Sequence, residues 1–252
     1  MTAAPTSERA WYVYGILPGD VELGGDVTGV GDPPAPVRVV RSGGLAALVS
    51  QVDPASPLGS PEDLMAHQEM LDASAAEVPV LPMRFGAVLA SEEAVATELL
   101  DAHHDDFTAA LHELEGRAQY VVKGRYAEPA IMEEVLSEDQ EAERLRREIR
   151  GKDPDATRGA RIRLGEIVNN AISAKREADT QALLEAMADH GIASVVREPS
   201  HERDAVHVAI LVGADQEKEM EKAIDGLARR WAGRVDVHLL GPMAAYDFVG
   251  AT

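Results

Sequence analysis

The chain has 252 residues, no cysteine and a formal net charge of −20. The length suits two ordinary domains, and the lack of cysteine excludes disulfides, thiolate metal sites and a cysteine nucleophile. A surface this acidic repels phosphate and anionic lipid headgroups, so nucleic acid and membrane surfaces are not expected partners, and no apolar run approaches the roughly 20 residues of a membrane span.

The negative charge is concentrated in the first half of the chain. Residues 1–116 hold 19 Asp and Glu against 4 Lys and Arg, whereas residues 117–252 hold 25 against 20. Such a surface either keeps the protein soluble or steers a basic partner, and composition does not separate these two readings. Residues 1–10 include Glu8 and lack an apolar run, so they do not read as a secretory signal and a cytoplasmic location is expected.

The first elements in chain order are strands. Residues 11–17, 37–41 and 45–52 are rich in aromatic and β-branched residues, and the last two should form a hairpin around a Ser-Gly-Gly turn. Between the first two strands, residues 18–36 are dense in Gly, Pro and Asp, which predicts a mobile loop without a core-forming pattern. A Ser N-cap, a Pro and two acidic residues then open a helix that should cover residues 61–76.

An extended segment and a second helical stretch complete the first half. Residues 78–85 are apolar but contain two prolines, which indicates an edge strand or an extended segment rather than a central strand. A helical pattern opens at Ser91 and continues, with an interruption near His103, to a stop at Gly116. We therefore expect an acidic N-terminal α+β domain with a small antiparallel sheet over residues 1–116.

The second half shows a different order of elements. The expected strands are residues 119–126, 192–198, 205–212 and 234–240; the expected helices are residues 129–150, residues 157–190 and a helix with the stripe Met220, Ile224, Leu227 and Trp231. With the helix at 129–150 treated as an insertion, the order is βαββαβ, the ferredoxin-like arrangement. The predicted fold class is thus α+β, with a ferredoxin-like domain and a C-terminal tail over residues 117–252.

One face of the second sheet is only partly apolar. Alternation places His207 and Leu211 of one strand, and His238 and Leu240 of another, on the face that the helices leave free. Such a face needs a cover. The first domain, the tail after Gly241 or a partner protein could each supply it.

No catalytic template or metal motif is present. The chain lacks a nucleophile elbow, a phosphate-binding loop, a zinc-binding His-Glu-x-x-His helix and a dinucleotide fingerprint. The densest histidine group, His103, His104 and His112, has no i,i+4 histidine pair, so a solvated polar face is favoured over a metal site. No cofactor and no enzymatic activity are expected.

Two polar residues stand out among apolar neighbours. His67 lies on the predicted helix at 61–76, and Arg84 lies in the extended segment at 78–85. A guanidinium in such surroundings normally needs a carboxylate or carbonyl partner. The favoured interpretation is an internal ion pair of Arg84 with Glu69, Asp72 or Glu77, and the alternative is a site for an external anion.

Several segments together resemble the gas vesicle protein GvpL/GvpF family. They are YVYGI at residues 12–16, HQ at 67–68, PVLPMRFG at 79–86, VVK at 121–123, LGP at 240–242 and YDF at 246–248. The resemblance spans almost the whole chain. It departs at residues 243–245, where the family often has Trp-Pro-Pro and this chain has Met-Ala-Ala.

The resemblance implies an accessory or minor component of gas vesicles. Its implied partners are the hydrophobic shell subunit and other gas vesicle accessory proteins, and its implied location is the cytoplasm and the gas vesicle. The alternatives are a small-molecule-sensing regulatory protein, since ferredoxin-like domains often bind ligands, and a metal-dependent hydrolase. The candidate partner-binding or structural residues are Tyr12, Tyr14, His67, Arg84, Phe85, His207, Leu211, His238, Tyr246 and Phe248.

Overall fold

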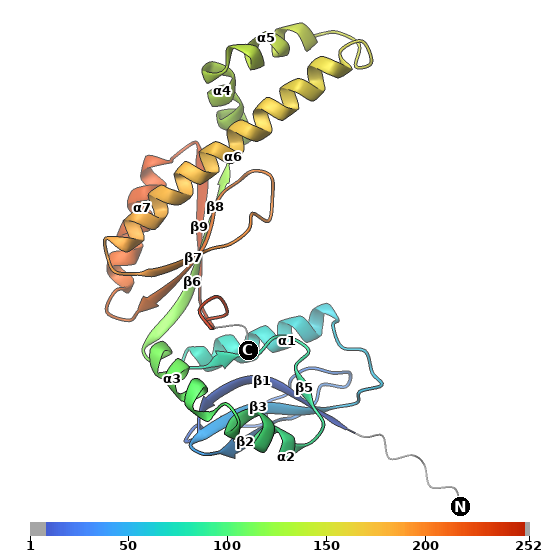
Figure 1. The fold of residues 1–252 in the computed structure, drawn as a ribbon, viewed down its shortest axis with the longest axis vertical. Coiled ribbons are helices and arrows are strands. Elements are labelled where there is room, and N and C mark those ends of the chain that lie inside the picture. Colours follow the sequence, from blue (N-terminus) through green and yellow to red (C-terminus); the bar gives the residue numbers. More distant parts are fainter. Residues whose placement is uncertain (1–8, 250–252) are drawn as a thin grey trace, which may run out of the picture. The chain divides into compact units, whose positions relative to one another are not determined.

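The computed structural model describes residues 9–249, which divide into two compact units (Figure 1). The first contains residues 9–119 and 241–249, and the second contains residues 120–240. The division therefore falls after Gln119 rather than after Gly116, and the tail that the sequence assigned to the second domain groups with the first unit. The reason is that the tail finds its contacts in the first unit, as described below.

The first unit contains an antiparallel sheet in the order β2-β3-β1-β4, and β5 also pairs with β1. Its strands are β1 (Ala10–Pro18), β2 (Val37–Ser42), β3 (Leu45–Val52), β4 (Leu81–Pro82) and β5 (Val88–Leu89). The predicted hairpin of β2 and β3 is confirmed, and β4 lies at the sheet edge as its proline indicated. The pattern did not predict β5, because two residues are too few to show a period.

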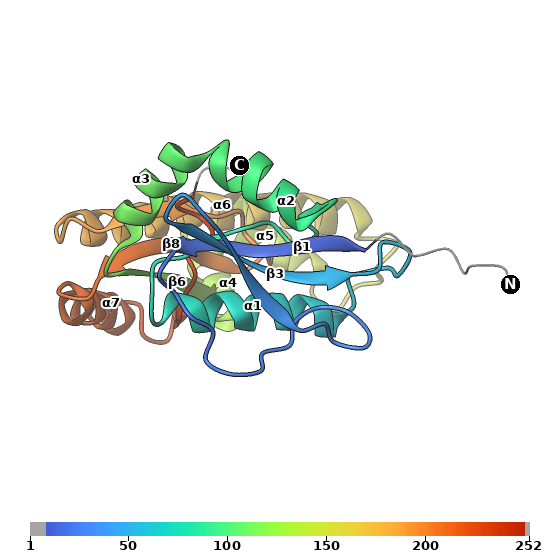
Figure 2. The same ribbon diagram turned by 90° about the horizontal axis from the view of Figure 1, so that it is seen from below.

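Helices cover both faces of this sheet (Figure 2). They are α1 (Pro61–Ala75), α2 (Glu92–Ala94), the π-helix η1 (Val95–Asp101) and α3 (His104–Leu114). Figure 2 shows α1 on one side of β1 and β3, and α2 and α3 on the other side. A strand between two helical layers is expected to be apolar throughout, and every residue from 11 to 17 is indeed buried.

A β-bulge in β1 sets which side chains face α1. The register with β3 shifts between Val13 and Gly15, so Tyr14 has no direct partner. Before the bulge the even-numbered residues of β1 face this core, and after it the odd-numbered residues do. Tyr12, Tyr14 and Leu17 therefore all enter the same core cluster. Gly15 permits the close approach, because a Cβ there would lie 2.7 Å from Leu71 Cδ2.

The loop between β1 and β2 is part of this core, contrary to the expectation of a mobile loop without core residues. Val30 is 1% exposed, and Val21, Leu23 and Val27 pack against the same cluster. The loop is further held by an isolated bridge between Thr28 and Pro36. Its apolar residues are separated by Gly and Asp, so they show no helix or strand period that a sequence pattern could reveal.

The second unit contains a sheet in the order β7-β8-β6-β9. Its elements are β6 (Arg117–Tyr126), α4 (Glu128–Glu138), α5 (Gln140–Ile149), α6 (Arg158–Ala188), β7 (Ala193–Val196), β8 (Asp204–Gly213), α7 (Glu217–Arg230) and β9 (Val235–Met243). The predicted order of strands and helices is confirmed apart from the helix expected at 129–150. Tyr120 and Tyr126 of β6 are an even number of residues apart, so their side chains point to the same face of the sheet. Tyr126 binds Asp179 of α6 and Tyr120 binds Glu217 of α7, so both helices lie on that face.

The expected single helix at 129–150 is two helices. Asp139 has extended backbone angles, φ −113° and ψ 110°, and its side chain accepts a hydrogen bond from the Ala142 N–H at 2.9 Å. It therefore ends α4 and caps α5. The two helices pack against the first half of α6 through Ala142, Leu145 and Ile167.

Candidate functional site

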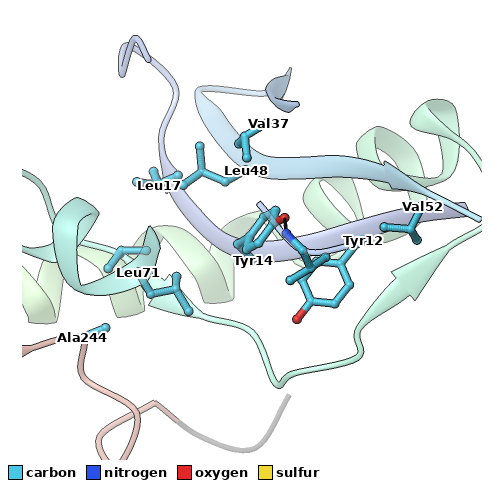
Figure 3. Close-up of a cluster of buried hydrophobic side chains, with 10 residues drawn as sticks. Tyr12, Tyr14, Leu17, Val37, Leu48, Val52, Leu71 and Ala244 are labelled. Atoms are coloured by element: carbon cyan, nitrogen blue, oxygen red, sulfur yellow. Dashed lines mark hydrogen bonds between the residues drawn. The ribbon is translucent and has the colours of Figure 1, made fainter. Parts of the chain in front are cut away.

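Four of the predicted site residues form one aromatic cluster in the first unit. The ring centroid of Tyr12 lies 4.8 Å from that of Tyr14, 5.7 Å from that of His67 and 5.8 Å from that of Phe85. His67 also contacts Phe85 edge-on at 5.6 Å. Figure 3 shows the two tyrosines projecting from β1 into the core that also contains Leu71 of α1 and Ala244 of the tail. We call Tyr12, Tyr14, His67 and Phe85 the aromatic cluster.

The hydrogen bonds of Tyr12 determine the tautomer of His67. The Gly86 N–H donates to the Tyr12 hydroxyl oxygen at 3.3 Å, and this hydroxyl lies 2.8 Å from His67 Nδ1. We assign the Tyr12 hydroxyl as the donor and His67 Nδ1 as the acceptor, which leaves the hydroxyl proton on the oxygen and places the hydrogen of the neutral ring on Nε2. Nε2 is buried, and no atom of residues 9–249 makes a hydrogen bond with it.

Burial keeps these groups uncharged. It lowers the pKa of His67 below its ordinary value, and the main chain of Met83 opposes this shift only in part. It also raises the pKa of Tyr12 and Tyr14, so neither hydroxyl ionises near neutral pH. The aromatic cluster is therefore a neutral packed core and not an acid–base pair.

Tyr14 and Asp63 hold the loop of residues 19–36 in place. The Tyr14 hydroxyl accepts from the Val30 N–H at 2.9 Å and lies 2.8 Å from Ser50 Oγ. The Asp63 carboxylate accepts from the N–H groups of Gly31 and Ser60 at 2.8 and 3.1 Å. These main-chain donors, Gly31 foremost, lower the pKa of Asp63 despite its burial. The residue pattern predicted a helix start here but did not indicate that Asp63 also anchors the loop.

The tail docks on the first unit next to the aromatic cluster. The Ala244 N–H donates to Asp72 Oδ1 at 2.9 Å, and Ala244 is completely buried. Gln119 and Asp247 are joined twice, by Gln119 Nε2 to Asp247 Oδ2 at 2.7 Å and by the Asp247 N–H to Gln119 Oε1 at 3.0 Å. Tyr246 packs half-buried against the same core, and Phe248 is also half-buried.

The expected ion pair of Arg84 is not formed. Arg84 is exposed, and within residues 9–249 its guanidinium has no carboxylate or hydrogen-bond partner. Two facts explain this. On the extended chain its neighbours Met83 and Phe85 point inward, so Arg84 points outward, and Asp72 instead accepts hydrogen bonds from Ala244 and Gln68. The Arg84 charge is thus available to an external anion or carboxylate.

The other predicted residues lie in the second unit and do not form one site. His207 and Leu211 are on β8, whereas His238 is on β9, and β6 separates these strands. His207 is half-buried, with Nδ1 2.8 Å from the Glu198 carbonyl oxygen; Leu211 is buried and His238 is exposed. A small cavity of about 280 Å³ beside His207, lined also by Arg176 and Glu177, is at the lower limit for a small-molecule site.

A charged network that no motif indicated fixes β9 to the helices. Arg234 Nε lies 2.7 Å from Glu134 Oε2, and Arg234 Nη1 lies 2.8 Å from Asp179 Oδ2. Lys175 also contacts Glu134, at 2.6 Å. Burial by itself would raise the pKa of Glu134, but hydrogen bonds from Arg234 and Lys175 outweigh it and lower the pKa. The partners are up to 100 residues apart in the chain, so no local pattern could pair them.

One edge of the second sheet, formed by β9, offers a docking surface for a strand. β9 lies at the edge, where β6 is its one partner among the strands of residues 9–249. Along it Asp236, His238 and Leu240 are exposed, while Val237 and Leu239 are half-buried, and Leu240 is 48% exposed. The first sheet offers no comparable edge beside β1, because β4 and β5 are two residues each. We call residues 235–240 the β9 edge.

Neither a membrane span nor a metal cluster is found in the described part of the chain. None of the helices in residues 9–249 is both long and apolar enough to cross a bilayer. Within the same residues, no three His, Asp or Glu side chains are grouped so that they could hold a metal ion. His104 instead lies 2.7 Å from the Gly43 carbonyl oxygen and 3.0 Å from Asp105 Oδ1.

Comparison with known proteins gives one consistent result. The family model described as "Gas vesicle synthesis protein GvpL/GvpF" matches residues 10–250. Gas vesicle protein F of a Streptomyces species is 34% identical over 245 residues, which cover 94% of this chain and 98% of that protein. Gas vesicle protein L of a Streptomyces species is 29% identical and covers 97% of this chain and 94% of that protein.

Two solved structures have the same fold. The crystal structure of GvpF from an Anabaena species matches with a TM-score of 0.77 and 21% identity, over 97% of this chain and 98% of that one. GvpF from Microcystis aeruginosa matches with a TM-score of 0.74 and 18% identity, over 95% and 98% of the two chains. The predicted α+β class is confirmed by these matches.

Proposed function

The chain belongs to the GvpL/GvpF family of gas vesicle synthesis proteins, and we propose that it acts there as an assembly factor that binds the hydrophobic shell subunit. The family consists of gas vesicle proteins involved in vesicle formation and not of enzymes. Binding of the shell subunit would assist nucleation and assembly by keeping that subunit from aggregating. Its proposed location is the cytoplasm and the gas vesicle, with other gas vesicle accessory proteins as further partners.

The physical need for such a factor follows from the chemistry of the shell. A small apolar subunit exposes surface that water does not tolerate, and it aggregates unless a partner covers that surface. A strand of such a subunit also carries main-chain N–H and C=O groups that need partners. A binding protein therefore has to offer both apolar contact and unpaired main-chain groups.

The observation that carries the proposal is the β9 edge. We interpret the unit of residues 120–240 as a ferredoxin-like domain, in which the sheet order β7-β8-β6-β9 leaves β9 at an edge. Natural edge strands are commonly protected by lysines, prolines or short length. The β9 edge contains no Lys, Arg or Pro and exposes Leu240, so it can accept an apolar strand by β-augmentation.

Co-expression with the shell subunit tests this proposal. We expect the wild-type protein to increase the fraction of shell subunit that stays soluble after centrifugation. Leu240→Lys places a charge at the edge and should reduce that fraction, because a buried unpaired lysine opposes strand docking. The matched control is Met65→Lys on α1, which places the same charge on another exposed apolar residue, one that is not part of the β9 edge.

The result can contradict the proposal in two ways. If the wild-type protein neither co-purifies with the shell subunit nor changes its solubility, shell binding is wrong. If Leu240→Lys and Met65→Lys behave like the wild type, binding does not use the β9 edge. Circular dichroism of each purified variant checks that the fold is retained.

A further inference from the structure

A cluster of basic residues lies at one end of the helical hairpin in the second unit. Residues 144–163 hold eight of the chain's 24 Lys and Arg residues, against three Asp and Glu. These residues belong to the second half of α5, the first turns of α6 and the loop that joins the two helices (Figure 1). In a chain with a net charge of −20 this segment has the opposite sign. We call it the basic tip.

Half of the basic tip is free of internal ion pairs. Arg146 and Arg147 both bind Glu143 within their own helix, at 2.8 Å. In contrast, Arg150, Lys152, Arg158 and Arg161 are exposed, and none of them lies within 4.0 Å of a carboxylate in residues 9–249. Four positive charges are therefore available for an external partner.

Helix stability does not account for these charges. Arg158 and Arg161 lie in the first turn of α6 and at the start of the next, where the helix dipole disfavours cations, and the first turn of α6 contains no acidic residue. The first turns of α5 and α7 each contain two acidic residues. The placement of arginines at this end of α6 costs local stability, which suggests a role in binding.

The first unit has a surface of the complementary sign. Residues 92–115 form α2, η1 and α3, and they contain eight Asp and Glu but no Lys or Arg. All eight carboxylates are exposed, and within the described chain their ion pairs are with histidine only, at His104–Asp105 and His112–Glu115. We call these carboxylates the acidic face.

We infer that the basic tip of one molecule binds the acidic face of a second copy of this chain. The two surfaces differ, so the contact is heterologous and joins molecules head to tail, into a ring or an open chain. A second copy is the favoured partner because it carries the acidic face, whose eight exposed carboxylates match the four unpaired cations of the tip. This inference stands apart from the proposed binding of the shell subunit, since neither surface includes the β9 edge.

The mass of the full chain in solution tests the inference. At about 0.05 M NaCl the weight-average mass from sedimentation should rise with protein concentration above the monomer mass of 27.0 kDa. At about 0.5 M NaCl it should fall back to the monomer, because salt screens exposed charges. A monomer at every concentration and both salt levels would overturn the inference.

Charge-reversal variants locate the contact. The tip variant carries Lys152→Glu, Arg158→Glu and Arg161→Glu, and a face variant carries Glu98→Lys, Asp106→Lys and Glu113→Lys. Each variant alone should remain monomeric at low salt. The control carries Lys218→Glu, Arg229→Glu and Arg230→Glu on α7, which changes the net charge as much as the tip variant does. It should associate like the wild type, and its loss of association would overturn the inference.

Mixing the two variants gives the most selective result. The tip variant keeps an intact acidic face, and the face variant keeps an intact basic tip, so one contact can form between them. An equimolar mixture should therefore reach the mass of a dimer and no more, because both ends of that dimer are blocked. A mixture that stays monomeric overturns the inference. The inference is also overturned if the wild type stays monomeric on its own but binds a DNA duplex, and the tip variant does not bind that duplex.

Discussion

At the residue scale, glycines in the loop of residues 19–36 decide how closely that loop packs on Tyr14. A Cβ at Gly29 would lie 1.8 Å from the Tyr14 hydroxyl oxygen, whereas a Cβ at Gly24 would meet nothing within 4 Å. The hydroxyl also binds the Val30 N–H, so a displaced Tyr14 would lose that bond. Gly29 is therefore a packing requirement, and Gly24 is not.

Gly29→Ala should destabilise the first unit by about 1–3 kcal/mol, the usual cost of overpacking a core. Chemical denaturation of the variant and of wild type measures the difference. Gly24→Ala is the matched control in the same loop and should change the free energy of unfolding by less than about 0.5 kcal/mol. Equal effects of the two substitutions would show that the loop does not pack tightly on Tyr14.

His67 makes stability depend on pH with a defined sign. Burial lowers the pKa of His67 in the folded state. At a pH between the ordinary histidine pKa and this lowered pKa, the unfolded chain therefore binds a proton that the folded chain does not bind. The free energy of unfolding should therefore fall as the pH is lowered through and below the ordinary histidine pKa of about 6.5. His67→Phe should flatten this part of the profile.

The measurement is the free energy of unfolding from about pH 8 to about pH 5, compared between wild type and His67→Phe. A substitution of the exposed His238 by Gln serves as the control and should leave the slope of the wild type in place. If the wild-type profile and the His67→Phe profile run parallel, His67 is not held neutral in the folded protein.

Only part of the residue-scale arrangement could be predicted. Tyr12, Tyr14, His67, Phe85 and Tyr246 were candidates because of the family resemblance, and the structure brings them to one core. Whether they bind a partner stays a prediction. The free guanidinium of Arg84 was the less favoured alternative, since a sequence cannot show that Asp72 accepts a hydrogen bond from a main-chain N–H 172 residues away.

At the element scale, patterns located strands and long helices well and failed at irregular joints. The hairpin of β2 and β3 and the buried stripe of α7 follow from period and turn residues. The π-helix η1 could not be predicted, because its buried residues Val95 and Leu100 are five apart and do not fit an α-helical stripe. The break at Asp139 was missed because the acidic run around it looks like a continuous charged helix.

The role of Asp139 as the joint between α4 and α5 gives a further prediction. Asp139→Ala removes the acceptor for the Ala142 N–H and should cost about 1 kcal/mol of stability. Hydrogen exchange at the Ala142 amide should become faster. Glu133→Ala on α4, an exposed acidic residue without a partner in the described chain, is the control, and an equal loss there would contradict a capping role.

At the scale of the whole molecule, the sequence predicted two α+β domains with the tail in the second, whereas the structure groups the tail with the first unit. Residues 241–249 belong to the first unit, where Asp72 and Gln119 bind their main chain. The contacts span 128 and 172 residues of sequence, and the binding groups are common side chains. No local pattern could have paired them.

Removal of residues 244–252 should therefore weaken the first unit and spare the second. The truncation uncovers the core beside Leu71 and leaves the partners of the tail without their hydrogen bonds. Hydrogen exchange followed by mass spectrometry should show faster exchange in β1 and α1 and unchanged exchange in β8. Truncation after Val249 is the control, and uniform loss of protection in both units would contradict this assignment.

The docking of the tail has a consequence for how the protein is made on the ribosome. The first unit obtains its contacts with Ala244 and Asp247 last, because these residues are translated after the whole second unit. At about 5–20 residues per second this delay is roughly 6–24 s. During that time the site for the tail beside the aromatic cluster is open, so a chaperone or a nascent partner that covers apolar surface would meet the first unit in its unfinished form.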